Sequence, residues 1–173
     1  MYLDYHPKEE ASMSEYSALD PVREQEILDG LFETVTNLPE ETVFIGRLGL
    51  RVTLRGLTSS KVDAIRERCT VRKTTKGQVT EKIDSELFNA ALIKEATSML
   101  EVVKKADSGG DHGGEPQSVK LSGWDDARLT SRLKLSGGEE AIRRLLLAGE
   151  LDAVGDKVLE ISGFGVDIDD VKN

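Results

Sequence analysis

The side chains that most often act as nucleophiles or general bases are scarce in this sequence. Its 173 residues include one cysteine, Cys69, and two histidines, His6 and His112. A nucleophile needs a base within hydrogen-bonding distance, and a histidine is that base only when a rigid element aims its ring. His6 lies in a polar leader and His112 in a glycine-rich segment, so neither is expected to be held in place. These residues predict no catalytic triad, no activated thiol and no enzyme activity.

Acidic and glycine-rich segments are the remaining candidates for metal or phosphate chemistry. Asp167, Asp169 and Asp170 carry oxygens that suit a hard cation, but the segment lacks the glycine turn and the distant glutamate of a calcium loop. Gly46–Gly49 and residues 108–111 have glycines typical of phosphate-binding loops, yet neither segment has a P-loop lysine. We therefore expect a solvated tail, a hairpin turn and a linker, with no metal and no cofactor.

The charge of the chain argues against nucleic acid as a partner. Asp and Glu number 32 against 23 Lys and Arg, and the net charge of −9 repels a phosphate backbone. Residues 125–147 have the outline of a helix-turn-helix in which Arg143 and Arg144 could face phosphate. The acidic residues around them are Asp125, Asp126, Glu139 and Glu140. Their charge is wrong for a recognition surface, so a DNA-binding regulator is disfavoured.

Cysteine usage and hydropathy predict a cytosolic protein without a membrane partner. A single cysteine cannot form an intramolecular disulfide. Residues 1–15 contain four acidic residues and no apolar segment, which is unlike a signal peptide. No other stretch approaches the roughly 20 apolar residues of a membrane span.

After the leader, the spacing of apolar residues is first that of a helix and then that of a strand. Asp20 can cap a helix that begins with Pro21, and Pro39 ends it. The apolar face of this helix consists of Ile27, Leu28, Leu31, Phe32, Val35 and Leu38. In residues 48–54 every second side chain is leucine or valine, which predicts a strand with one buried face, and Val43–Ile45 would be its hairpin partner.

Helical spacing returns after residue 58. Val62, Ile65 and Cys69 fall on one stripe, which places Cys69 toward the core as a small apolar residue. Residues 70–82 indicate either a second hairpin that turns at Lys76-Gly77 or an exposed loop. Asp84 begins a long helix whose broad apolar face predicts packing on two sides, as the central element of the fold. That face includes Leu87, Phe88, Ala91, Leu92, Ile93, Ala96, Met99, Leu100 and Val103.

Three more helices are expected after a glycine-rich stretch. The first contains Leu129 and Leu133. The second starts at the Ser136–Glu139 capping-box spacing and closes at Gly149. The third covers residues 151–161.

These elements predict an α+β fold, mainly helical with one or two small β-hairpins, plus a C-terminal three-helix unit after a flexible Gly-rich linker. The linker is expected because residues 107–116 contain four glycines and no apolar residue. The predicted division is a flexible leader at 1–19, an α+β domain at 20–104, the linker at 105–118, the helical unit at 119–163 and an acidic tail at 164–173.

Two apolar side chains are candidates for contact with a partner. If Ile142 and Leu146 face the core, Leu147 points roughly the opposite way at about 100° per residue. It then either meets Leu151 of the next helix or offers a contact to a partner. Trp124 leaves the same choice open, because tryptophan is common both in cores and at interfaces. Trp124 and Leu147 are therefore our candidate partner-binding residues.

Several short motifs occur in a characteristic order. The alternating strand ends with LRGLT at residues 54–58, and the next helix finishes with RCT at residues 68–70. A lysine-rich segment leads to EKID at residues 81–84 and the long helix. The joint between the last two helices, within residues 142–151, fits the pattern LLxxGE and is followed by VLEI at residues 158–161. In this order the sequence resembles the XkdN-like phage tail assembly chaperones.

This resemblance implies a non-catalytic binding protein of a phage or prophage. Such a protein binds the tape measure protein, keeps it soluble and helps to recruit tail tube protein subunits. It is expected in the host cell cytoplasm and not in the mature virion, and self-association into a homo-oligomer stays open. The alternative is a minor structural tail or baseplate protein, which would be present in purified particles.

Overall fold

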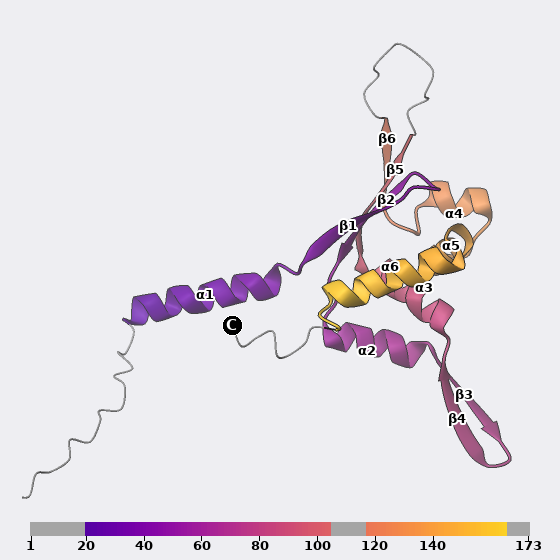
Figure 1. Ribbon diagram of the computed structural model, residues 1–173, viewed down its shortest axis with the longest axis horizontal. Coiled ribbons are helices and arrows are strands. Elements are labelled where there is room, and N and C mark those ends of the chain that lie inside the picture. The colour runs from indigo at the N-terminus through magenta and orange to yellow at the C-terminus, as the bar shows by residue number, and fades with distance from the viewer. Residues whose placement is uncertain (1–19, 105–116, 166–173) are drawn as a thin grey trace, which may run out of the picture. The chain divides into compact units, whose positions relative to one another are not determined.

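The computed structural model describes residues 20–104 and 117–165, which belong to two compact units. The first unit ends at Asn37 and contains helix α1, and the second begins at Leu38. The described residues form six helices, one four-stranded sheet and one two-stranded sheet (Figure 1). This is the predicted α+β class.

Helix α1 (Pro21–Thr36) begins and ends as its sequence predicts. The Asp20 side chain accepts a hydrogen bond from the N–H of Val22 at 3.4 Å, and Pro21 occupies the first turn. Pro39 follows the helix and lacks the N–H that a further turn would need. The helix buries none of its residues.

The larger sheet belongs to the second unit and has the strand order β1-β2-β5-β6, with every neighbouring pair antiparallel. Its strands are β1 (Glu40–Ile45), β2 (Leu50–Arg55), β5 (Thr97–Val103) and β6 (Ser118–Leu121). The β1–β2 hairpin confirms the predicted pairing of the two alternating segments. Val43, Val52, Leu100 and Leu121 are aligned across the four strands.

The long helix predicted from Asp84 is wrong in its second half. Helix α3 (Ser85–Ala96) begins at Asp84, whose side chain accepts from the N–H of Leu87 at 3.0 Å, but it ends before strand β5. Leu100 is fully buried and pairs in register with Val52, while Met99 beside it is 38 % exposed. The apolar residues after Ala96 therefore alternate across a sheet. Their density alone resembled a helix face, because a centre strand is also rich in apolar residues.

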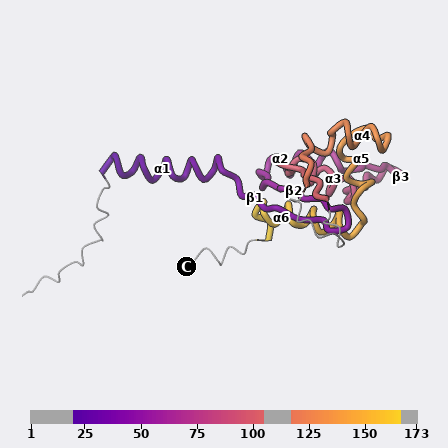
Figure 2. Tube along the Cα trace, turned by 90° about the horizontal axis from the view of Figure 1, so that it is seen from above, coloured from indigo at the N-terminus to yellow at the C-terminus, as the bar shows by residue number. Residues whose placement is uncertain are grey.

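Helix α3 is the central element, as predicted. It packs against α6 (Ala148–Ile161), α5 (Gly138–Leu145) and α2 (Ser59–Arg68). Helix α6 lies alongside β1, where Lys157 pairs with Glu41 at 3.3 Å (Figure 2). The fully buried large side chains of this core include Val52, Leu54, Val62, Leu92, Ile93, Leu100, Ile142 and Val158.

The domain division predicted at residues 105–118 stays a prediction. Residues 105–116 lie outside the described residues, and the strands that flank them, β5 and β6, pair with each other. Helices α5 and α6 pack on α3 and share its core, because their apolar faces are complementary to it. The boundary between the two compact units lies after Asn37. The predicted leader and residues 166–173 of the predicted tail also lie outside the described residues.

The helix ends near α5 differ from prediction. Ser136 donates its N–H to Glu140 at 2.7 Å, so Glu139 does not complete a capping box; it binds Arg68 at 2.6 Å. Gly149 does not close a helix but lies in the first turn of α6. Helix α5 ends earlier because Leu146 has an extended backbone conformation.

Candidate partner-binding surfaces

Leu147 lies at the joint between α5 and α6 and is 59 % exposed. Leu146 beside it is buried in the core. The extended backbone of both residues turns one leucine inward and the other outward. Leu147 is therefore available for a partner in this structure, and its role in binding stays a prediction.

An ion pair holds this joint against the β1–β2 turn. Arg47 donates from Nε and Nη2 to the two carboxylate oxygens of Glu150, at 3.0 and 2.7 Å, and from Nη2 to the carbonyl of Leu145 at 2.6 Å. Glu150 also accepts the N–H of Leu147 at 2.9 Å. The Arg47 guanidinium and then the Leu147 N–H lower the pKa of Glu150 to about 2. The exposed leucine is thus presented by a fixed backbone.

Trp124 is buried in the same unit. Its side chain is 2 % exposed, and its Nε1–H donates to Oγ1 of Thr97 at 2.8 Å. A buried ring with a satisfied N–H stabilises the core, and it reaches a partner only after a local rearrangement. Binding of a partner by Trp124 also stays a prediction.

Strands β3 (Thr70–Thr75) and β4 (Gln78–Ile83) form a two-stranded hairpin, which we call the hairpin arm. Lys76 and Gly77 form its turn with φ angles of 51° and 79°, as a tight two-residue hairpin requires. All of its residues except Thr70 are exposed. Residues 70–82 thus form the hairpin, which was one of the two alternatives that the sequence left open.

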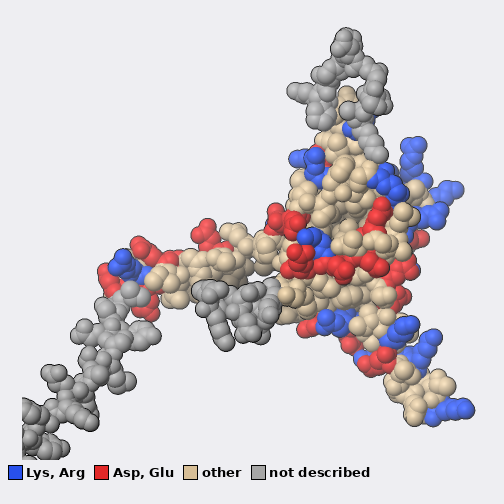
Figure 3. Space-filling view, in the orientation of Figure 1, with Lys and Arg blue, Asp and Glu red and all other residues tan. Residues whose placement is uncertain are grey.

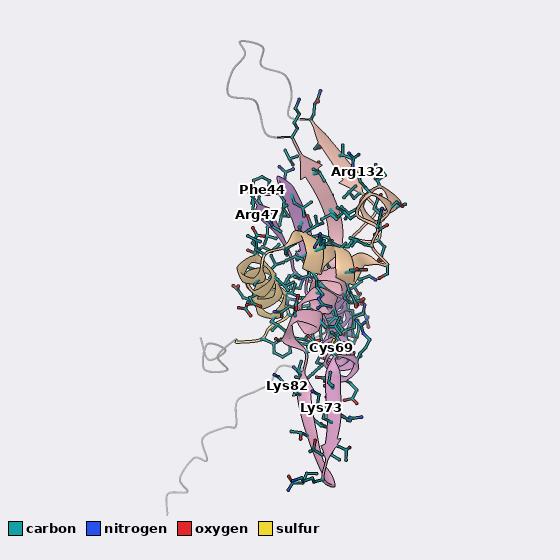
Figure 4. The ribbon with its side chains drawn as sticks, turned by 90° about the vertical axis from the view of Figure 1, so that its right-hand side faces the viewer. Phe44, Arg47, Cys69, Lys73, Lys82 and Arg132 are labelled. Atoms are coloured by element: carbon teal, nitrogen blue, oxygen red, sulfur yellow. The ribbon has the colours of Figure 1, made fainter. Side chains whose placement is uncertain are left out.

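One face of the hairpin arm carries basic side chains over a groove. Val71, Lys73, Thr75, Thr80 and Lys82 lie on this face, which we call the lysine face. Together with the start of α3 they line a groove of about 560 Å³. Lys73 and Lys82 project from the two strands in Figure 4. The sequence could have indicated that Lys73 and Lys82 share a face, because a two-residue turn at Lys76-Gly77 fixes the register of the two strands.

Helix α1, taken by itself, is amphipathic and acidic. Leu28, Leu31, Phe32 and Val35 form an apolar stripe, and their exposure ranges from 38 to 66 %. The helix contains four acidic residues and one basic residue, a net charge of −3. Its surface suits an apolar partner with a basic rim.

The residues considered for catalysis or phosphate binding have structural roles where they are described. Cys69 is buried, and desolvation raises the pKa of its thiol. Gly46–Gly49 is the β1–β2 turn, as predicted. Arg143 pairs with Glu86 at 3.3 Å, so its guanidinium already has an acidic partner within the chain. The two histidines, the three tail aspartates and residues 108–111 lie outside the described residues.

No helix in residues 20–104 or 117–165 is long and apolar enough to cross a membrane.

Comparison with known proteins assigns the chain to a family. The family model described as "Phage XkdN-like tail assembly chaperone protein, TAC" matches residues 28–173, which is most of the sequence. No curated protein and no solved structure matches the chain.

Proposed function

The chain belongs to the XkdN-like family of phage tail assembly chaperones, and we propose that it binds the tape measure protein and keeps it soluble. In this proposal it also helps to recruit tail tube subunits. It acts without catalysis in the host cell cytoplasm and is absent from the mature virion. The observation that carries the proposal is the family match over residues 28–173.

Two physical features support a holding function. A protein that protects an aggregation-prone partner needs accessible apolar surface, and both the α1 stripe and Leu147 offer it. It also needs to keep the complex in solution, which a net charge of −9 favours.

We propose that Leu147 is a contact residue for the tape measure protein. Its side chain is exposed, and its N–H donates to Glu150, which Arg47 binds in turn, so its backbone is held before binding. Prior order reduces the entropy lost on association. Trp124 lies in the core of the same unit, away from solvent.

The test is co-expression of the chain with the tape measure protein of its phage. We expect the tape measure protein to stay soluble and to co-purify with the chain. Leu147→Ser should reduce the recovered complex by about tenfold, as loss of a central apolar contact does. The matched control is Leu133→Ser, a leucine that is 39 % exposed on another helix.

Two outcomes would count against the proposal. Equal aggregation of the tape measure protein with and without the chain contradicts a holding function. Detection of the chain in purified particles favours a minor tail or baseplate component instead. If Leu147→Ser and Leu133→Ser bind equally well, only the assignment of Leu147 is lost.

A further inference from the structure

Most basic side chains of the hairpin arm form no ion pair with any described residue; Arg72 is the exception. Residues 70–83 contain four basic side chains and one acidic side chain, a net charge of +3 in a chain of net −9. Figure 3 shows these basic side chains along the arm and at its tip. An isolated two-stranded hairpin is only marginally stable in water, so covering one of its faces would stabilise it.

The two faces of the arm differ in their electrostatics. On one face Arg72 donates to Glu81 and to Glu67, each at 2.7 Å, and these carboxylates neutralise the charge of Arg72. On the other, Lys73 and Lys82 make no ion pair with any described residue. The positive charge of the lysine face is therefore not balanced by any described acidic residue.

The groove beneath the lysine face is open to a ligand. Asp84 and Glu86 line its inner end, but Asp84 caps α3 and Glu86 pairs with Arg143. Val71 and Ile83 add apolar surface and are 46 and 38 % exposed. The groove therefore suits an elongated ligand with an apolar stripe and acidic edges.

Helix α1 has that chemistry. Glu24 precedes Leu28 by one turn on the apolar stripe, and Asp29 borders the stripe beside Phe32 at about 100° per residue. The 16-residue helix is about 24 Å long, and the six-residue strands of the arm are about 20 Å long. The two surfaces match in length, polarity and charge.

We propose that the lysine face of the hairpin arm binds helix α1 of a second copy of this chain. The inference goes beyond the proposed function, because it concerns association of the chain with itself. Since the two surfaces are different, the contact is heterologous and joins copies head to tail into a ring or an open filament.

The experiment measures the mass of the purified full chain by size-exclusion chromatography with light scattering over a concentration series. Wild type should form dimers and larger species that dissociate as salt increases. The double variant Lys73→Glu, Lys82→Glu and the double variant Glu24→Lys, Asp29→Lys should each weaken association by roughly 100-fold, because like charges then face each other. Arg132→Glu, Lys134→Glu is the matched control, with two exposed basic residues of another segment, and should assemble as wild type does.

Mixing distinguishes this contact from other modes of association. The lysine-face variant retains an intact α1, and the α1 variant retains an intact arm. The two mutated surfaces are also opposite in charge, so an equal mixture should form assemblies in which the two variants alternate in a one-to-one ratio. Combining all four substitutions in one chain should restore association. A monomeric wild type, an unchanged mass for both double variants, or a mixture in which the two variants do not associate would overturn the proposal. Circular dichroism confirms that each variant is folded.

Discussion

Arg47 and Glu150 are 103 residues apart in the sequence and form an ion pair through two hydrogen bonds, which joins the β1–β2 turn to the first turn of α6. The same carboxylate accepts the backbone N–H of Leu147. One pair of charges thus fixes both a tertiary contact and the residue that we propose for partner contact.

The first prediction concerns the pH dependence of this contact. The pKa of Glu150 is about 2 in the folded chain and 4.5 as its ordinary value. A carboxylate whose pKa is lowered by folding stabilises the fold above its unfolded pKa, and the stabilisation is lost as the pH falls toward the folded pKa. Wild type should therefore be more stable than Glu150→Gln at pH 7, and the difference should vanish between pH 4.5 and 2. Urea denaturation at a series of pH values measures it.

The control for this prediction is Asp156→Asn, which changes an exposed acidic residue of the same helix. It should follow the wild-type dependence. A difference between wild type and Glu150→Gln that stays constant with pH would contradict the role of the ion pair.

The second prediction concerns the bond between Trp124 and Thr97. Thr97→Val leaves the buried indole N–H without an acceptor and should lower the free energy of unfolding by about 1 to 3 kcal/mol. Trp124→Phe should cost a similar amount, because it removes the donor and leaves a small void. In a double-mutant cycle the double variant should lose less free energy of unfolding than the sum of the losses of the two single variants. Simple additivity, measured by chemical denaturation, would show that the bond contributes nothing.

The third prediction separates a strand from a helix at residues 97–103. Leu100→Ala should lower the free energy of unfolding by about 2 to 5 kcal/mol, because the leucine is fully buried between β2 and β6. Met99→Ala, its exposed neighbour, should cost less than about 1 kcal/mol. Similar costs for both changes would be inconsistent with alternation across the sheet.

The fourth prediction compares two glycines. A Cβ at Gly56 would lie 2.7 Å from the carbonyl oxygen of Ile161, so Gly56→Ala must displace the backbone and should cost about 1 to 3 kcal/mol. A Cβ at Gly149 has no neighbour within 4 Å, and Gly149→Ala should stabilise α6 by roughly 0.5 kcal/mol. Thermal unfolding should show a lower midpoint for Gly56→Ala and a higher one for Gly149→Ala; an unchanged or raised midpoint for Gly56→Ala would refute the packing at Gly56.

Local chemistry in the sequence was sufficient for several elements. Asp20-Pro21 and Asp84 placed two helix starts correctly, and Lys76-Gly77 marked the turn of a hairpin that was one of two alternatives, because caps and tight turns depend on only a few neighbouring residues. Alternation in residues 48–54 likewise identified β2. The sequence alone also determined the net charge and the order of motifs that resembles the chaperone family.

The tertiary structure decided what depends on distant partners. Residues 97–103 are apolar enough for a helix face, and only pairing with β2 and β6 makes them a strand. Trp124 and Leu147 were equal candidates for a surface, yet the core encloses one and leaves the other exposed. Nothing in the sequence indicates that Arg47 and Glu150 form an ion pair. Burial and long-range pairing arise from packing of the whole chain, so local periodicity cannot specify them.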